Sequence, residues 1–249
     1  MNDAFAILTE TMAGHRSIRR FLPDPVPEET IREAVQAAQQ AATSSWIQAY
    51  SLLQITDPDE RQQLAELTGG QPQVAEAGAF FAVCADSRRH RLVAEQLGKP
   101  YEGNLETFLL GVVDASLFAQ NLTLAFESAG LGTCYIGGLR TRLPEVDALL
   151  EIPHGVWPLF GLCVGTPDPE VPTAIRPRLP VEAVWMKDRY LDDERTRALM
   201  EVHDQEAAVH YAGRGLEGRN WTGGLWRKFA KPVREHLHGY YTGKGARLE

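Results

Sequence analysis

The sequence predicts a mixed α/β chain with a compact core up to about residue 166 and a C-terminal extension after it. Helix-period and strand-like segments follow one another without internal repeats, and the chain changes character over 167–180, where prolines punctuate an extended stretch. A chain of 249 residues, 44% of them hydrophobic, can bury a substantial core as one large domain or two small ones.

Each element is predicted from its apolar pattern and its end signals. Helix-period spacing, with acidic first turns or closing glycines, predicts helices that end near residue 14, begin near residue 28, and cover 57–70, 104–130, 144–150 and about 192–211. Short apolar runs predict strands from about residue 49, over 79–86, and in the segments CYIGG and WPLFGLCVG. The segment 104–130 is apolar nearly all round, so we expect it to be buried in the core or in a subunit interface.

Charge and composition exclude several classes of protein. The formal net charge of -8 argues against a nucleic-acid binder, because such proteins need a broad field of Lys and Arg. The first ten residues are acidic and too short in apolar sequence for a signal peptide, and no run of about 18 apolar residues suggests a membrane span. Cys84, Cys134 and Cys163 each lie in an apolar run, which indicates reduced, buried strand cysteines in a cytoplasmic protein.

Familiar catalytic signatures are missing from the sequence. It contains no GxGxxG after a strand, GxxxxGK[ST], GxSxG or HExxH. His203, Glu206 and His210 fall roughly on one helical face and are the best metal candidates, but a solvated helix explains this charged segment better, so we expect no metal.

The basic stretch HRSIRRF, residues 15–21, is unusual in an acidic chain. In extended geometry Arg16 and Ser17 offer guanidinium donors and a hydroxyl, a combination suited to a phosphate ester. The alternative is a solvated arginine cluster paired with acids such as Asp24 and Glu28, and the stretch by itself supports both equally. A second basic pair, Arg176 and Arg178, held extended by prolines, favours the phosphate interpretation.

Eight motifs taken together resemble a known family. They are HRSIRRF, TSSWIQ, TGGQ, VCAD with RRH, GVVDASLFAQN, ESAGLGTCYIGGLR, LFGLCVGTP and RPRLP. In this order, from about residue 5 to 235, they resemble the FMN-dependent nitroreductase superfamily, in its branch of oxygen-insensitive NADPH nitroreductases and NADPH-flavin oxidoreductases. The resemblance implies an α+β fold with a central, mostly antiparallel sheet flanked by helices and a long buried helix at a dimer interface. It also implies an FMN-binding core over 1–166 and a C-terminal extension over 167–249 that completes the FMN site and carries an NADPH-binding loop.

The resemblance also implies a role for each matching residue. The FMN contacts would be His15, Arg16 and Ser17 at the phosphate and ribityl chain, Arg19 at the pyrimidine edge, Thr43, Ser44 and Ser45 in a turn, Gln71 at the ring edge, the backbone of Tyr135, Ile136, Gly137 and Gly138, and Arg176 and Arg178 at the phosphate. Relatives usually have Lys-Pro-Arg where this chain has Arg-Pro-Arg, which keeps the charge. Arg214 and Arg219 would recognise the 2′-phosphate of NADPH. Taken singly, Gln71 is more often a helix-start residue than a ligand, and Tyr135 would be a core residue.

The implied function is an FMN-dependent NADPH oxidoreductase that reduces nitroaromatics and quinones by two electrons in a ping-pong cycle. The flavin carries the chemistry, so the chain needs no nucleophile, and Arg19 would stabilise charge on the reduced ring. Two alternatives stay open: a supplier of reduced free flavin, and a flavin-sequestering protein with little turnover. We expect a cytoplasmic homodimer whose FMN touches both chains, with no nucleic-acid or membrane partner.

Overall fold

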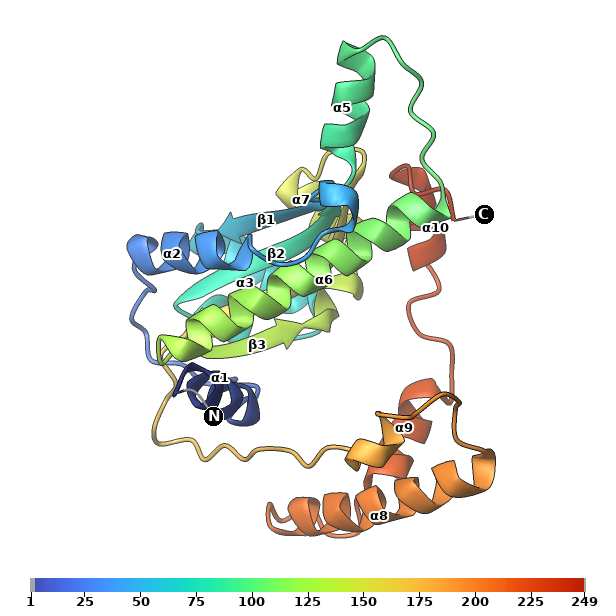
Figure 1. Ribbon diagram of the computed structural model, residues 1–249. Coiled ribbons are helices and arrows are strands. Elements are labelled where there is room, and N and C mark those ends of the chain that lie inside the picture. The colour runs from blue at the N-terminus through green and yellow to red at the C-terminus, as the bar shows by residue number, and fades with distance from the viewer. Residues whose placement is uncertain (1–2, 249) are drawn as a thin grey trace. The chain divides into compact units, whose positions relative to one another are not determined.

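The computed structural model describes residues 3–248, which form two units (Figure 1). The first holds the chain up to Thr173 together with the residues from Arg234 on, and the second holds Ala174–Val233.

A four-stranded sheet forms the centre of the first unit. Its order is β1 (Tyr50–Ile55), β2 (Ala79–Asp86), β4 (Val156–Gly165), β3 (Gly132–Ile136), and every neighbouring pair is antiparallel. The two inner strands are buried along nearly their whole length and are apolar except for Asp86 at the end of β2, as expected for strands covered on both faces. The four predicted strands and the antiparallel sheet are thus confirmed. The cysteines are free, buried and placed in β2, β3 and β4, as expected.

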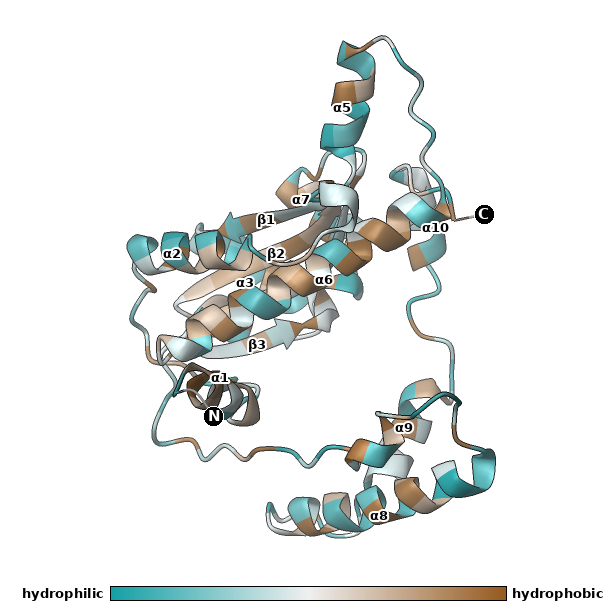
Figure 2. Ribbon diagram, viewed as in Figure 1, coloured by the Kyte–Doolittle hydropathy of each residue, from teal (hydrophilic) through white to brown (hydrophobic). Residues whose placement is uncertain are grey.

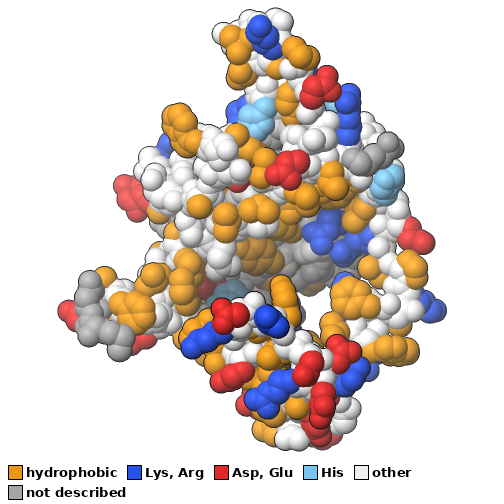
Figure 3. Space-filling view, turned by 45° about the vertical axis from the view of Figure 1, so that its right-hand side comes forward, with side chains coloured by type: hydrophobic (Ala, Val, Ile, Leu, Met, Phe, Trp, Pro, Cys, Tyr) orange, Lys and Arg blue, Asp and Glu red, His pale blue; other side chains and the backbone are white. Residues whose placement is uncertain are grey.

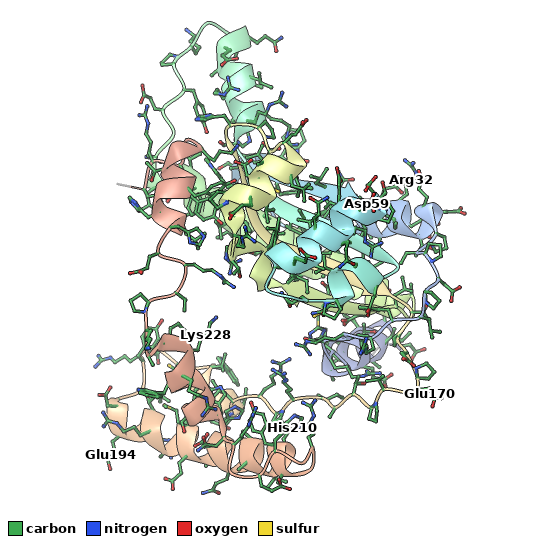
Figure 4. All side chains as sticks on the ribbon, turned by 180° about the vertical axis from the view of Figure 1, so that it is seen from behind. Arg32, Asp59, Glu170, Glu194, His210 and Lys228 are labelled. Atoms are coloured by element: carbon green, nitrogen blue, oxygen red, sulfur yellow. The ribbon has the colours of Figure 1, made fainter. Side chains whose placement is uncertain are left out.

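Helices cover both faces of this sheet. The views from front and back show α6 on one face and α3 and α7 on the other (Figures 1 and 4). The helices of the first unit are α1 (Asp3–Ala13), α2 (Glu28–Ala38), α3 (Pro58–Leu67), α4 (Gln73–Glu76), α5 (Arg88–Gln96), α6 (Leu105–Ser128), α7 (Leu143–Leu150) and α10 (Leu237–Gly243), with short 3-10 turns at Ser44–Trp46 and Gly137–Arg140. The helices predicted up to residue 14, near 28, over 57–70, 104–130 and 144–150 are confirmed, while α5 and α10 were not predicted.

The long helix α6 is buried on one side only. Eight of its residues are buried against the sheet, among them Phe118 and Phe126, which stack on Tyr50 and Phe81. Its other side leaves apolar residues exposed, and these appear as brown bands on the side of α6 turned to the viewer in Figure 2. By length and composition alone, α6 is the one helix within residues 3–248 that could cross a membrane, which corrects the expectation that no such run exists. Its packing shows it to be the core helix of this fold.

The last residues of the chain return to the first unit. Tyr241 donates its hydroxyl to the carbonyl of Pro158 at 2.7 Å, and the indole of Trp157 donates to the carbonyl of Lys244 at 3.1 Å. Lys244 in turn pairs with Asp147 on α7 at 2.9 Å. These contacts fix α10 beside β4 and α7.

The second unit is built on one charged helix. It contains a 3-10 turn at Val181–Ala183, α8 (Asp193–Ala212) and α9 (Trp221–Phe229). Asp192 caps α8 by accepting from the backbone N–H of Arg195, which explains why the helix begins where the sequence predicted. The helix α9 was not predicted, because glycines dominate its flanks.

Candidate functional site

The first basic motif is fixed along the free edge of β3. Ser17 forms a parallel bridge with Thr133, and the N–H of Ile18 donates to the carbonyl of Thr133 at 2.8 Å. Farther along, Phe21 bridges to Pro167. The side chain of Ile18 is buried, so the alternation of an extended chain turns its neighbours outward.

His15 is oriented by a carboxylate of α6. Its Nδ1 donates to Glu127 Oε1 at 2.8 Å, and the same oxygen accepts from Thr133 Oγ1 at 2.7 Å. Glu127 therefore ties the motif to both α6 and β3. A hydrogen bond at one ring nitrogen fixes the ring and directs the other, Nε2, away from the carboxylate.

The arginines of the motif divide into two kinds. Arg20 pairs with Glu76 at 3.2 Å, and Arg16 is held by Thr173 Oγ1 at 2.9 Å and by the carbonyl of Gly14 at 3.0 Å. Arg19 contacts only the carbonyl of Ser17, at 3.5 Å, among the hydrogen bonds within residues 3–248. The solvated-cluster alternative invoked Glu28, but Glu28 pairs with Arg32 on its own helix.

The end of β3 meets the TGGQ turn. A Cβ on Gly138 would lie 2.2 Å from both Gln71 Nε2 and the carbonyl oxygen of Thr68, so the glycine is required for this close approach. Gly137 is different, because a Cβ there would have only Arg140 as a neighbour, at 3.8 Å. The turn therefore combines open space at Gly137 with close packing against Gln71 at Gly138.

The side chains before these glycines are structural. Ile136 is fully buried. Tyr135 accepts a hydrogen bond from Thr123 on α6 at 3.0 Å and packs edge-on against Phe160. Burial raises the pKa of Tyr135, against a lowering contribution from the Thr123 hydrogen bond. Only the backbone of these residues can therefore serve a ligand.

Thr43, Ser44 and Ser45 lie elsewhere in the first unit. They precede β1, which is the edge strand opposite β3. Neighbouring strands are 4.7–4.9 Å apart, so the two edges are about 14 Å apart. The structure does not bring these three residues together with His15, Gln71 and the glycines within one chain.

A buried carboxylate holds this turn. Asp114 on α6 is 1% exposed and accepts from the hydroxyl of Thr43 and, at 3.0 Å each, from the backbone N–H groups of Ser44 and Ala49. Ser45, Trp46 and Gln48 all have positive φ angles, between 46° and 60°. Non-glycine residues adopt this conformation only when surrounding contacts impose it. Asp114 supplies those contacts.

Arg176 and Arg178 belong to the second unit, where they line a pocket with residues of α8 and α9. Arg214 and Arg219 are exposed in the glycine-rich loop between these helices. Asp204 on α8 anchors this loop by accepting from Asn220 Nδ2, Thr222 N and Thr222 Oγ1 at 2.6 to 2.8 Å. Burial acts to raise the pKa of Asp204, but the hydrogen bonds from Thr222 and the backbone of Trp221 outweigh it, so the pKa lies below its ordinary value and the carboxylate stays ionised.

The metal candidates do not form a ligand set. His203 and His210 line the pocket of the second unit, whereas Glu206 is exposed and absent from its lining. Within residues 3–248 no group of three His, Cys, Asp or Glu side chains could hold a metal ion.

Sequence reasoning missed three carboxylates that organise these sites: Glu127, Asp114 and Asp204. Asp114 left a signal, a single acid within the apolar run GVVDASLF, which only a buried partner can explain. Asp204 lies among polar neighbours, and Glu127 lies in the last turn of its helix, where an acidic residue is not unusual.

The sheet, the core helix and the clustered motif residues define a family. The Nitroreductase family profile matches residues 12–166, and the profile of its C-terminal domain matches 176–249. The chain belongs to the nitroreductase family.

Its similarity to individual members extends over nearly the whole chain. It is 38% identical to "FMN reductase (NADPH)" of Bacillus subtilis over 95% of this chain and 96% of that protein. It is 39% identical to "Oxygen-insensitive NADPH nitroreductase" of Salmonella typhimurium over 92% and 95%. The solved structure of Bacillus megaterium NfrA1 superposes with a TM-score of 0.92 at 41% identity, covering 96% of this chain and 98% of that one. The predicted family and fold class are confirmed.

Proposed function

We propose that this protein is an FMN-dependent NADPH oxidoreductase that reduces small acceptors by two electrons. One structural observation supports this most strongly. A basic, hydroxyl-bearing segment lies along β3, and the same strand leads into Gly137, which is open above, and then into Gly138, which packs closely against Gln71. A phosphate site and a flat ring site thus share one strand.

The residues present fit FMN. An extended strand rises about 3.3 Å per residue. Gly137 follows Thr133 by four steps, so the ring site lies about 13 Å from the bridge between Ser17 and Thr133. His15, Arg16 and Ser17 would hold the phosphate and ribityl chain at one end. Open space at Gly137, with Gln71 as a donor, would admit the planar ring at the other.

Each residue has a physical task in this site. Bound FMN would supply hydride acceptance from NADPH and two-electron donation to the acceptor. Arg16 would neutralise phosphate charge, and Glu127 fixes the His15 ring so that Nε2 can face the ligand. Arg19, whose guanidinium has one weak contact, is available to stabilise negative charge at the pyrimidine edge.

The donor and acceptors follow from the relatives. The Vibrio harveyi relative is "NADPH-flavin oxidoreductase", 36% identical over 95% of this chain and 96% of that protein. A Pseudomonas relative is "CR(VI) reductase", at 34% identity. We place NADPH as donor, with Arg214 and Arg219 at its 2′-phosphate, and nitroaromatics, quinones or free flavin as acceptors that use the site in turn with NADPH. We also place the protein in the cytoplasm.

A homodimer would complete the site. Thr43, Ser44 and Ser45 lie at the edge of the sheet opposite the other flavin residues, so one chain cannot bring the two groups together. A second copy, packed across α6, could bring its own turn to the basic motif that lies along the edge of β3. Each FMN would then touch both chains.

Exposed apolar surface supports this dimer. Leu105, Leu109, Val113 and Leu117 repeat every four residues along α6 and are 40–51% exposed. Helix α1 has no buried residue although it carries Phe5, Ile7 and Leu8. Helix α5, the protrusion at the top of Figure 3, exposes Leu92, Val93 and Leu97. Apolar surface on this scale marks an interaction site.

The visible spectrum of the purified protein tests the function. We expect a yellow protein whose flavin absorbance bleaches within the mixing time of an anaerobic stopped-flow experiment with NADPH, and returns on addition of a nitroaromatic. The bleach separates an enzyme from a flavin-sequestering protein. A colourless protein that takes up no added FMN would overturn the proposal.

A dedicated supplier of reduced flavin is the second candidate, because relatives carry both names. The two functions differ in how turnover depends on the acceptor. Turnover with free FMN and with a nitroaromatic, measured at equal NADPH, assigns the main role to the acceptor with the higher kcat/KM.

A further inference from the structure

The second unit contains a pocket of about 290 Å³ of its own. It lies between the extended segment 176–179 and one face of α8. The residues that line it are Arg176, Pro177, Arg178, Leu179, His203, Ala207, His210, Tyr211 and Trp221. Figure 4 shows His210 on the side of α8 that faces the extended segment.

The local sequence determines this lining. His203, Ala207 and His210 are spaced by four and three residues and so share one helical face. Pro177 and Pro180 keep the facing segment extended, with its two arginines at i and i+2. Trp221, the first residue of α9, stands edge-on to the His203 ring at 5.2 Å between centroids and forms an aromatic wall.

Two imidazole nitrogens in this lining have no hydrogen-bond partner within residues 3–248. They are Nδ1 of His203, a residue that is only 4% exposed, and Nε2 of His210. A buried polar atom left unpaired costs about 1–3 kcal/mol. Asp204, the next residue on α8, has every hydrogen bond satisfied, so the unit is not loosely assembled. Within the second unit, both buried side-chain nitrogens without a partner belong to residues that line the pocket.

The chemistry of the lining selects an anion. Besides the Tyr211 hydroxyl and the Trp221 indole, its polar groups are two guanidinium groups and two imidazoles, and no carboxylate lines the pocket. Arginine forks match phosphate oxygens, and imidazole N–H groups donate to them. Tyr211 and Trp221 add flat apolar walls for a ring attached to the anion.

We propose that this pocket is a phosphate-ester subsite in which His203 and His210 bind the phosphate together with Arg176 and Arg178. The inference rests on the proposed function, which supplies two phosphate esters with aromatic rings, FMN and NADPH. The chemistry is common to both, and the experiment separates them.

The test compares His203→Asn and His210→Ala with Glu206→Gln, an exposed change on the same helix. Calorimetry measures the affinity of flavin-free protein for FMN, and of FMN-loaded protein for 2′,5′-ADP, the unreactive half of NADPH. We expect each histidine variant to weaken one of these ligands about tenfold, the scale of one hydrogen bond to a charged group. Weaker FMN binding assigns the pocket to the flavin phosphate, and weaker 2′,5′-ADP binding assigns it to NADPH.

Both affinities within twofold of wild type in both variants would overturn the proposal. The unfolding temperatures of both histidine variants show whether a loss of affinity comes from a folding defect. His210 is only half-buried, so His210→Ala still tests the proposal if His203→Asn does not fold. A wild-type protein that binds no FMN would instead refute the proposed function, so the two failures are distinguishable.

Discussion

Asp114 carries a charge into the core without a cationic partner within the described chain. A buried carboxylate is costly unless hydrogen bonds satisfy it, and here three donors from the 43–49 turn do so. The turn depends on the carboxylate in return, since three of its residues have positive φ angles. Asp114 is therefore a positioning residue for the proposed flavin turn.

Replacing this carboxylate by an amide tests that role. Asp114→Asn turns an N–H₂ toward donors, so we expect the free energy of unfolding to fall by about 2–3 kcal/mol. Chemical denaturation measures this change. Thr43→Ser keeps the hydroxyl donor and is the matched control, with a loss well below that of the amide variant. Equal stability of Asp114→Asn and wild type would show that the hydrogen bonds do not hold the turn.

The adjacent glycines Gly137 and Gly138 should respond differently to alanine. Gly138→Ala places a methyl against the carbonyl of Thr68 and against Gln71, so we expect a lower unfolding temperature. Gly137→Ala meets only a distant arginine, so the fold should be unaffected. It should nevertheless weaken FMN binding at least tenfold, because the methyl occupies the space proposed for the ring. Thermal unfolding and FMN titration of both variants measure the two effects, and FMN affinity preserved in Gly137→Ala would exclude the ring from this position.

At the scale of the element, the loop between α8 and α9 combines freedom with anchorage. Gly215 and Gly218 have positive φ angles that favour glycine. The hydrogen bonds from Thr222 to Asp204 fix the C-terminal end of the loop. Two exposed arginines are thus presented on a short loop with one fixed end, a suitable arrangement for a phosphate that enters and leaves.

The double variant Arg214→Ala with Arg219→Ala tests the donor assignment. We expect kcat/KM with NADPH to fall by about tenfold or more, while the value with NADH changes little, because only NADPH carries the extra phosphate. Arg227→Ala with Lys228→Ala removes the same charge from α9 and should preserve the ratio. An unchanged NADPH-to-NADH ratio in the loop variant would refute the assignment.

At the scale of the whole molecule, the exposed apolar face of α6 is the surface on which the proposed homodimer depends. Leu109→Glu with Val113→Glu places two charges in that face, and we expect the solution mass to fall from that of a dimer to that of one chain, with loss of bound FMN. Light scattering coupled to size exclusion measures the mass, and the flavin absorbance of the eluted protein measures the bound FMN. Gln62→Glu with Gln63→Glu adds the same charge on α3 and should remain dimeric. A wild-type monomer that retains FMN would contradict the proposed assembly.

The sequence predicted most of this fold because its elements depend on local patterns. The apolar run of β2, the periodicity of α6 and the capping residue Asp192 each act within a few residues of chain. Helices α9 and α10 were missed because their stability comes from contacts, such as the anchorage of Tyr241 to β4, rather than from propensity. The motif order was also sufficient to identify the family.

The sequence by itself determined the strands, most of the helices and the family, since periodicity, end signals and motif order are properties of neighbouring residues. Only the tertiary structure decided that Thr43–Ser45 lie across the sheet from His15, that Gly137 is open while Gly138 is packed, and that Asp114 and Glu127 reach across to the motifs. These facts depend on strand order and on contacts between residues up to 112 positions apart. No local pattern encodes such separations, because the chain brings these residues together only when the sheet and α6 pack.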